Sequence, residues 1–344
     1  MYFGGRRREP DTPDEGTETR RRACRGAIAL FAVVGLAACA PDRASDRARS
    51  SRTASADAPI ELTDDAGNAV RLAHPARRIV SLIPSATETL IAIGAAGDIV
   101  GRTRYDTAPE VAALPSVGGG VDASVEAIVN MRPDLVIAWR SDSRGSTRER
   151  LVSVGIPVFV LKTEDTTDIF RGIASMGRLT GRDSAALAVA TSVRRGLDDV
   201  RRAAAGRPTP KVFYLVYNDP PMTAGPRTFI AQLLSLAGAK SIFTDSSQLW
   251  PNVAMEEILR RDPDLLVVPA GAGVNSLDRL RQQSGWRDLR AVREGRVITV
   301  PADIVNRPSP IIARSARLLL EAIHPELRAD SAGAPRPTSA PAAR

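Results

Sequence analysis

The sequence predicts an α/β fold of two similar lobes, each with a mostly parallel sheet, joined by one long helix. Three observations indicate this fold. Short apolar strands alternate with amphipathic helices, a pattern typical of parallel sheets covered by helices on both faces. The stretch "VEAIVNMRPDLVIAW" at 125–139 returns as "MEEILRRDPDLLVVP" at 255–269, at a constant offset of 130 residues. Between these copies, residues 182–205 keep a helical periodicity throughout.

The first lobe is expected over residues 60–181 and begins with a hairpin. "IELTDDAGNAVRLA" alternates in polarity around Asp65-Ala66-Gly67, which is a turn signal. "RRIVSLIP" predicts a strand that ends at Pro84, and "SATETLIAIGA" predicts a helix that ends near Gly94. Further strands are expected over "DIVGRT", "DLVIAW" and "IPVFVLK", with helices over "VEAIVNM" and "STRERLVSVG".

The connecting helix is expected over residues 182–205, about 24 residues or about 36 Å long. Its apolar positions Leu187, Ala190, Val193, Leu197 and Val200 have helical spacing, and its other face carries arginine and aspartate. A helix this long and this polar on one side is expected to join two lobes.

The second lobe is expected over residues 206–325 and repeats the alternation of the first. Strands are predicted at "KVFYLVYN", "SIF", "DLLVVP" and "GRVITVP". Helices are predicted at "TFIAQLLSLAGA", "MEEILRRD", "SLDRLRQQSG" and "SPIIARSARLLLEAI". Because the repeat unit is a whole lobe, it indicates two related lobes and excludes a solenoid.

The N-terminus is interpreted as a lipoprotein-type signal peptide over residues 1–38. Arg20–Arg22 precede an apolar run of about 12 residues, which is too short to span a bilayer. "LAAC" then resembles a bacterial lipobox, which implies cleavage before Cys39 and lipid attachment to its sulfur. An ordinary signal peptide is the alternative. Residues 39–59 and 326–344 have few large apolar side chains, so a disordered tether and a disordered tail are expected.

Composition disfavours several functional classes. The net charge of +8 is spread without a basic stripe, so no nucleic-acid partner is expected. Cys24 and Cys39 precede the folded part, and His74 and His324 are the only histidines, so no metal site made directly by protein side chains is expected. No G-x-S-x-G motif and no cysteine nucleophile occur in the folded part, so we expect a protein that is not an enzyme.

The motifs resemble one known family. "RIVSLIPSATETL", "LPSVGGGVDASVEAIVNMRPDLVIAW", "NDPPMTAG" and "WPNV" are similar to the periplasmic substrate-binding proteins for cobalamin, iron–siderophore and haem of bacterial ABC importers. The resemblance covers about residues 60–325. It implies a ligand cleft between the lobes, a metal chelate as transported ligand, no resident cofactor, and a permease dimer with its ATPase as partner. It further implies an exported, periplasmic or cell-surface monomer held to the membrane only by its lipid. A ligand-binding module of a sensor system is the alternative.

The resemblance also assigns candidate ligand-binding residues at strand ends. The aromatic candidates suit a flat macrocycle, although each could instead cover the core. We expect a corrinoid, with an iron–siderophore or haem as the alternative. An anionic iron–siderophore would need converging positive charge, for which the candidates are Arg102, Arg104, Arg140, Arg227 and Arg307, although most of these could instead be ordinary surface arginines. The expected binding residues are Pro84, Ser85, Ala86, Thr87, Tyr105, Trp139, Arg140, Pro221, Met222, Thr223, Trp250, Asp303 and Arg307.

A glutamate is the second residue of each copy of the repeat, Glu126 in the first and Glu256 in the second. An acid on the first turn complements the helix dipole, and Asp122 and Asn252 are expected as the helix N-caps. The family resemblance implies a second role, in which Glu126 and Glu256 contact the two permease subunits.

Overall fold

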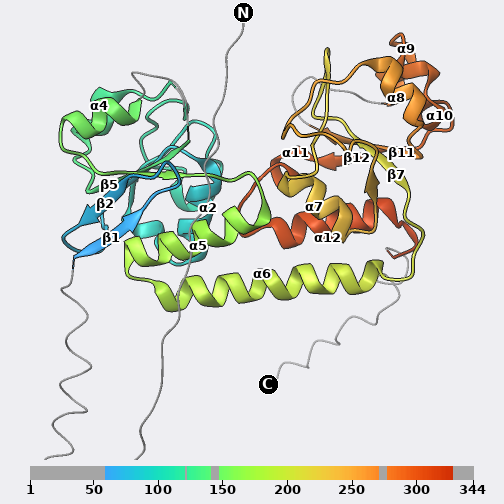
Figure 1. The fold of residues 1–344 in the computed structure, drawn as a ribbon. Helices are drawn as coiled ribbons and strands as arrows, with labels where there is room; N and C mark the ends of the chain where they lie inside the picture. Colours follow the sequence, from blue (N-terminus) through green and yellow to red (C-terminus); the bar gives the residue numbers. More distant parts are fainter. Residues whose placement is uncertain (1–58, 121, 141–146, 271–276, 328–344) are drawn as a thin grey trace, which may run out of the picture. The chain divides into compact units, whose positions relative to one another are not determined.

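The computed structural model describes residues 59–120, 122–140, 147–270 and 277–327, which contain two four-stranded parallel sheets (Figure 1). The first sheet has the order β4-β3-β5-β6 and the second has the order β10-β7-β11-β12. Helices cover both sheets and α6 joins the two lobes, so the predicted α/β fold class is confirmed.

The first lobe follows the expected order of elements and ends with one long helix, α5, that the sequence analysis did not predict. The hairpin strands pair antiparallel, and the tip of the hairpin reaches the outer edge of β6, where Asp65 N donates to Val160 O at 3.0 Å. In the sheet, β3 pairs in parallel with β5 in the register Ile79 to Leu135. The elements are β1 Ile60–Thr63, β2 Ala69–Leu72, β3 Ile79–Ser81, α2 Pro84–Ala92, β4 Ile99–Gly101, α3 Val125–Asn130, β5 Leu135–Trp139, α4 Thr147–Ser153, β6 Val158–Leu161 and α5 Thr166–Thr180.

The second lobe has the same alternation, plus a two-stranded ribbon and the short helices α10 and α11 that the sequence analysis did not predict. The ribbon is antiparallel and pairs Tyr217 with Met222. The elements are β7 Lys211–Tyr214, β8 Tyr217–Asn218, β9 Pro221–Met222, α7 Phe229–Leu236, β10 Lys240–Ser241, α8 Met255–Arg261, β11 Leu265–Ala270, α9 Leu277–Gln282, α10 Arg290–Arg293, β12 Val297–Pro301, α11 Ala302–Val305 and α12 Ile312–Ile323.

Helix α6, Asp183–Ala204, runs along both lobes beside α5 and α12 (Figure 1). Two close approaches depend on glycine: a Cβ on Gly177 would lie 2.5 Å from the Ala186 Cβ, and one on Gly196 would lie 2.7 Å from the Ala313 Cβ. The buried face agrees with the prediction except at Leu187, which is 66% exposed, because Ala186 lies on that face instead. One apolar cluster therefore continues from the first lobe through α6 to the second.

The repeated "PDL" motif has the same structural role in both lobes. Asp134 accepts hydrogen bonds from the backbone N of Arg77 and Arg78, at 2.8 and 3.0 Å. In the second lobe, Asp264 accepts one from Lys211 N at 2.8 Å. Each aspartate thus fastens the start of its own strand to the neighbouring strand. The repeated "PDL" motif therefore has a structural role in each sheet.

The N-caps expected for the two repeat helices are wrong. Ser124 caps α3, with its side chain accepting from Ala127 N at 3.2 Å, and Ala254 begins α8 without a side-chain cap. Asp122 instead forms an ion pair with Arg104. Asp122 and Asn252 precede their helices by three residues, too far for the capping position.

Candidate ligand-binding site

A cavity of about 330 Å³ lies where the first lobe faces the segment after α11 of the second. Two residues separate Pro84, which begins α2, from the end of β3, and Trp139 is the last residue of β5, so the first lobe contributes the carboxyl ends of neighbouring parallel strands. This is where ligands bind in open α/β sheets. The lining residues are Ile83, Pro84, Ser85, Tyr105, Trp139, Thr163, Asn306, Arg307 and Pro308.

Two aromatic side chains of this cavity are exposed. Tyr105 and Trp139 are each 56% exposed, and both line the same cavity. The Arg104 guanidinium lies 5.4 Å from the centre of the Tyr105 ring. Both rings are therefore available to a ligand and do not serve only to cover the core.

Only some of the binding residues predicted at the start of α2 line the cavity. Pro84 and Ser85 line it, whereas Ala86 and Thr87 are buried beneath it and do not. The Thr87 hydroxyl is 2.9 Å from Ser81 Oγ, to which it donates, and 3.3 Å from Ile83 O. Thr87 therefore fixes the strand-to-helix turn that presents Pro84.

The predicted residues of β9 and the following loop form a group of their own in the second lobe. The Thr223 hydroxyl is buried and donates to Tyr214 O at 2.8 Å, while Thr223 N donates to Pro251 O at 3.1 Å. These bonds hold Pro221 and Met222 beside the loop of Trp250, which is 39% exposed. None of these residues lines the cavity of about 330 Å³.

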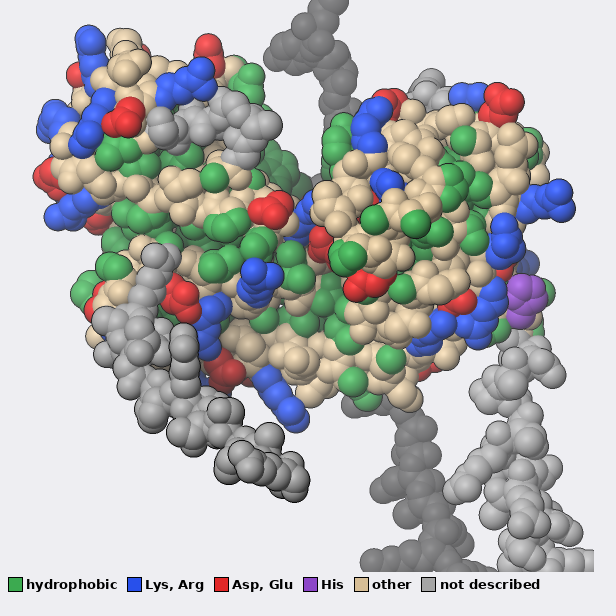
Figure 2. Space-filling model, turned by 180° about the vertical axis from the view of Figure 1, so that it is seen from behind, with side chains coloured by type: hydrophobic (Ala, Val, Ile, Leu, Met, Phe, Trp, Pro, Cys, Tyr) green, Lys and Arg blue, Asp and Glu red, His purple; other side chains and the backbone are tan. Residues whose placement is uncertain are grey.

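Every arginine considered for an anionic ligand has a partner within the described residues. Arg307 pairs with Glu88 at 3.0 Å, Arg140 pairs with Glu164 at 3.1 Å, and Arg104 pairs with Asp122. Arg102 and Arg227 donate to backbone carbonyl oxygens. On the face seen in Figure 2, basic and acidic side chains are interspersed and not separated into patches.

The sequence did not single out three polar residues near the cavity. Asn306 lines it and accepts a hydrogen bond from the buried Tyr214 hydroxyl at 2.6 Å. The Ser309 hydroxyl donates a hydrogen bond to the Glu88 carboxylate, which also pairs with Arg307, at 2.6 Å. Glu88 belongs to the "PSATE" motif, but its partners lie more than 200 residues away, so no local signal identifies them. Asp303, which was predicted, is exposed on α11 outside the lining.

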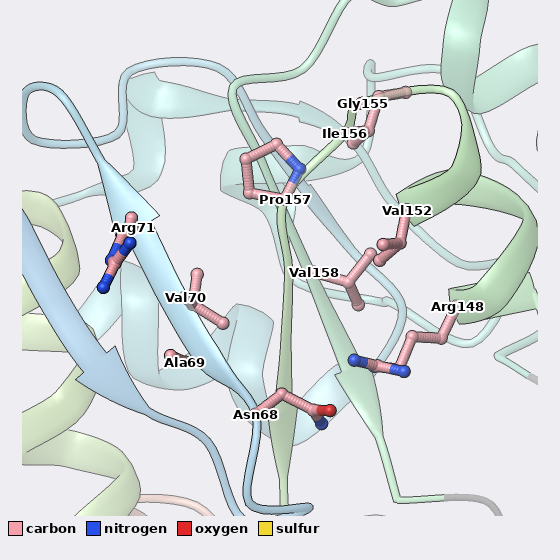
Figure 3. Close-up of a pocket in the computed structure, with 10 residues that line it drawn as sticks. All are labelled: Asn68, Ala69, Val70, Arg71, Arg148, Val152, Gly155, Ile156, Pro157 and Val158. Atoms are coloured by element: carbon pink, nitrogen blue, oxygen red, sulfur yellow. The ribbon is translucent and has the colours of Figure 1, made fainter.

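A second cavity, of about 250 Å³, lies in the first lobe among β2, α4 and β6 (Figure 3). Arg148 extends from α4 toward Asn68, and its buried Nε has no acceptor among the described residues. No predicted binding residue lines this cavity.

Two further findings concern only the described ranges. The described ranges contain no group of three or more His, Cys, Asp or Glu that could hold a metal ion. Across those same residues, no helix is both long and apolar enough to cross a membrane. Cys39 and the whole expected signal peptide lie outside the described residues, as do most of the expected tether and tail.

Two α/β lobes, a long connecting helix and a cavity at the strand ends define a substrate-binding protein. Residues 79–304 match the family of periplasmic binding proteins, and the chain belongs to that family. Since the family and its similar members are transport proteins, the expectation that the chain is not an enzyme is confirmed.

Three relatives illustrate the similarity. The uncharacterized ABC transporter substrate-binding lipoprotein YvrC of Bacillus subtilis is 27% identical over 314 residues, which cover 89% of this chain and 98% of that protein. A cobalamin-binding protein of Halobacterium salinarum is 30% identical over 321 residues, covering 87% of this chain and 85% of that protein. The solved periplasmic vitamin B12 binding protein BtuF of Vibrio cholerae has a TM-score of 0.62 at 25% identity, covering 74% of this chain and 99% of that one.

Proposed function

We propose that this chain is the substrate-binding component of an ABC importer, and that it captures a cobalamin-type corrinoid between its lobes. The exposure of Tyr105 and Trp139 on one cavity wall is the observation that carries the ligand assignment. A corrin ring is flat and largely apolar, so it gains from burying both aromatic faces. The ring is larger than the cavity, and we expect it to lie across the mouth with one edge inside. The similarity to two cobalamin-binding proteins supports the same ligand.

An iron–siderophore or haem is the second candidate ligand. Arg307 lines the cavity, and solved structures of the same fold include a haem-binding protein and an Fe³⁺-hydroxamate transport protein. In each case the metal belongs to the transported chelate, and the chain needs no resident cofactor.

The membrane-side partner is proposed to be a permease dimer with its ATPase, recognised through Glu126 and Glu256. Both side chains are exposed on the first turns of α3 and α8, and neither has an ion-pair partner within the described residues. The neighbouring Glu257, by contrast, is bonded to Arg260 and Arg261. One unpaired acid on each lobe suits a partner with approximate two-fold symmetry, where such charges set docking rate and register.

Export and anchoring by lipid at Cys39 complete the proposal. The motif "LAAC" follows the apolar run of the N-terminus, and the similar protein of Bacillus subtilis is a lipoprotein. One acyl chain holds a protein to a bilayer only marginally, whereas two or more hold it stably.

Calorimetric titration of the purified protein with cyanocobalamin, haem and ferric siderophores tests the ligand assignment. We expect cyanocobalamin to bind with the lowest Kd. If it does not bind below roughly 10 μM, which corresponds to about −7 kcal/mol, the corrinoid assignment is wrong. Binding of haem or a siderophore alone would replace it with the second candidate.

A further inference from the structure

A polar cluster joins the two lobes beside the cavity. Glu88, on α2 of the first lobe, accepts hydrogen bonds from Arg307 Nη1 at 3.0 Å and from Ser309 Oγ at 2.6 Å. Arg307 and Ser309 belong to the segment between α11 and α12 of the second lobe. The Arg307 and Glu88 side chains are only 18% and 24% exposed, so water screens this pair less than a surface pair.

The surroundings of Arg307 contain more negative than positive charge. Burial raises the pKa of Glu88, against the lowering effects of Ser309 and Arg307, and the charges of Asp106 and Asp303 raise that pKa further. Asp106 is itself buried and accepts from Thr103 N and Thr103 Oγ1, each at 2.7 Å. Thus the Glu88 that pairs with Arg307 is itself close to two further carboxylates, whereas the Arg104 guanidinium beside Tyr105 is paired with Asp122.

Arg307 is also fixed in position and not free to follow a ligand. Its Nη2 donates to the backbone oxygen of Tyr105 at 3.4 Å, while its Nη1 donates to Glu88. The guanidinium therefore spans from α2 to the loop that carries one of the two exposed aromatic rings. A ligand carboxylate that bonds the remaining N–H groups of Arg307 would lie close to the Glu88 carboxylate, and if it displaced Glu88 it would leave that carboxylate as an unpaired, partly buried negative charge.

We infer that Glu88 positions and neutralises Arg307, and that it thereby selects neutral or cationic metal chelates over chelates that carry carboxylates. The inference rests on the proposed ligand cavity but not on its occupant being a corrinoid. A neutral amide of the ligand can donate to the acidic surroundings of Arg307, whereas a carboxylate is repelled. Glu88 is a positioning residue here, since it acts on the ligand through Arg307.

The alternative role for Glu88 is purely structural, as a bond that holds the lobes together. The two roles predict different results. Loss of a structural bond lowers the affinity for every ligand and lowers the melting temperature. Loss of charge neutralisation changes the ratio of affinities for anionic and neutral ligands, and it makes the binding of anionic ligands depend on salt.

Glu88→Gln separates the two roles, because glutamine can still accept from Ser309 but carries no charge. Glu88→Asp keeps the charge on a shorter side chain. Glu61→Gln is the matched control, since Glu61 pairs with Arg71 at 3.0 Å on the exposed hairpin, away from the cavity. Kd is measured by calorimetry for the neutral cyanocobalamin, the cationic ferrioxamine B, and the anionic haem and ferric citrate.

Wild type is expected to bind its preferred neutral or cationic chelate at least tenfold more tightly than either anionic chelate. Glu88→Gln should reduce this ratio about tenfold, or about 1.4 kcal/mol, while Glu88→Asp and Glu61→Gln should leave it unchanged. Tighter binding of an anionic chelate by wild type, or an equal loss for all chelates in Glu88→Gln, would overturn the inference. If wild type binds ferrioxamine B but not cyanocobalamin, the corrinoid assignment is wrong, whereas the selective role of Glu88 is supported. If no chelate binds, both proposals are overturned.

Discussion

Replacing Trp139 with alanine should weaken corrinoid binding strongly while leaving the fold intact. A tryptophan side chain presents roughly 200 Å², and 56% exposure leaves about 110 Å² of it accessible in the free protein. A ligand that covers one ring face removes about half of that area from water, about 1.4 kcal/mol. Stacking adds about 0.5–1.5 kcal/mol. The Kd for cyanocobalamin should therefore rise about 25- to 130-fold.

The measurement is calorimetric titration of Trp139→Ala with cyanocobalamin, together with thermal unfolding. The free energy of unfolding should fall by about 2 kcal/mol, because the roughly 90 Å² of the side chain that is not exposed is packed against the protein. Trp139→Phe should recover most of the affinity. Leu187→Ala is the control, since Leu187 is an exposed apolar residue of α6 that does not line the cavity. A Kd within twofold of wild type for Trp139→Ala would refute the stacking argument.

Three further predictions concern other parts of the chain. The double variant Glu126→Lys, Glu256→Lys should leave the Kd for cyanocobalamin within twofold of wild type but abolish ligand-stimulated ATP hydrolysis by the reconstituted transporter. If stimulation is normal, the two glutamates do not contact the permease and only complement their helix dipoles. Arg290 and the Lys211 N–H lower the pKa of Asp264, so its stabilisation is complete above the usual carboxyl pKa of about 4 and is lost as pH falls through the lowered value. Urea unfolding should accordingly show Asp264→Asn less stable by about 1 kcal/mol at pH 7, a deficit that shrinks below pH 4; an equal deficit at both pH values would contradict the charge argument. Cys39→Ser should abolish incorporation of radioactive fatty acid, and equal labelling of both proteins would exclude the lipid anchor.

The order of the elements and the fold class were predictable because they depend on local patterns. Apolar alternation identified the strands and the hairpin around Asp65, and helical spacing identified α6. The repeat of "PDL" indicated two related lobes, and its two aspartates do have matching structural roles. These features involve residues that are close in sequence or related by the fixed offset of 130, so the chain alone displays them.

The motifs also placed several cavity residues correctly. Pro84, Ser85, Tyr105, Trp139 and Arg307 all line one cavity. Their positions at strand ends follow from the sheet order, which strand–helix alternation largely determines. The other predicted residues lie elsewhere in the structure. For all of them, including the five that line the cavity, the role in ligand binding stays a prediction.

Only the tertiary structure decided which polar groups form hydrogen bonds or ion pairs with one another. Asp122 was expected to cap a helix and instead pairs with Arg104, and Thr87 was expected to face a ligand and instead bonds to Ser81. Glu88 meets Arg307 across 219 positions of the chain. Helix and strand propensities act over a few residues, whereas burial and ion pairing depend on which surfaces the folded lobes bring together. The sequence therefore determined the lobes and the place of the cavity, and the packing of those lobes determined the charge that a ligand meets there.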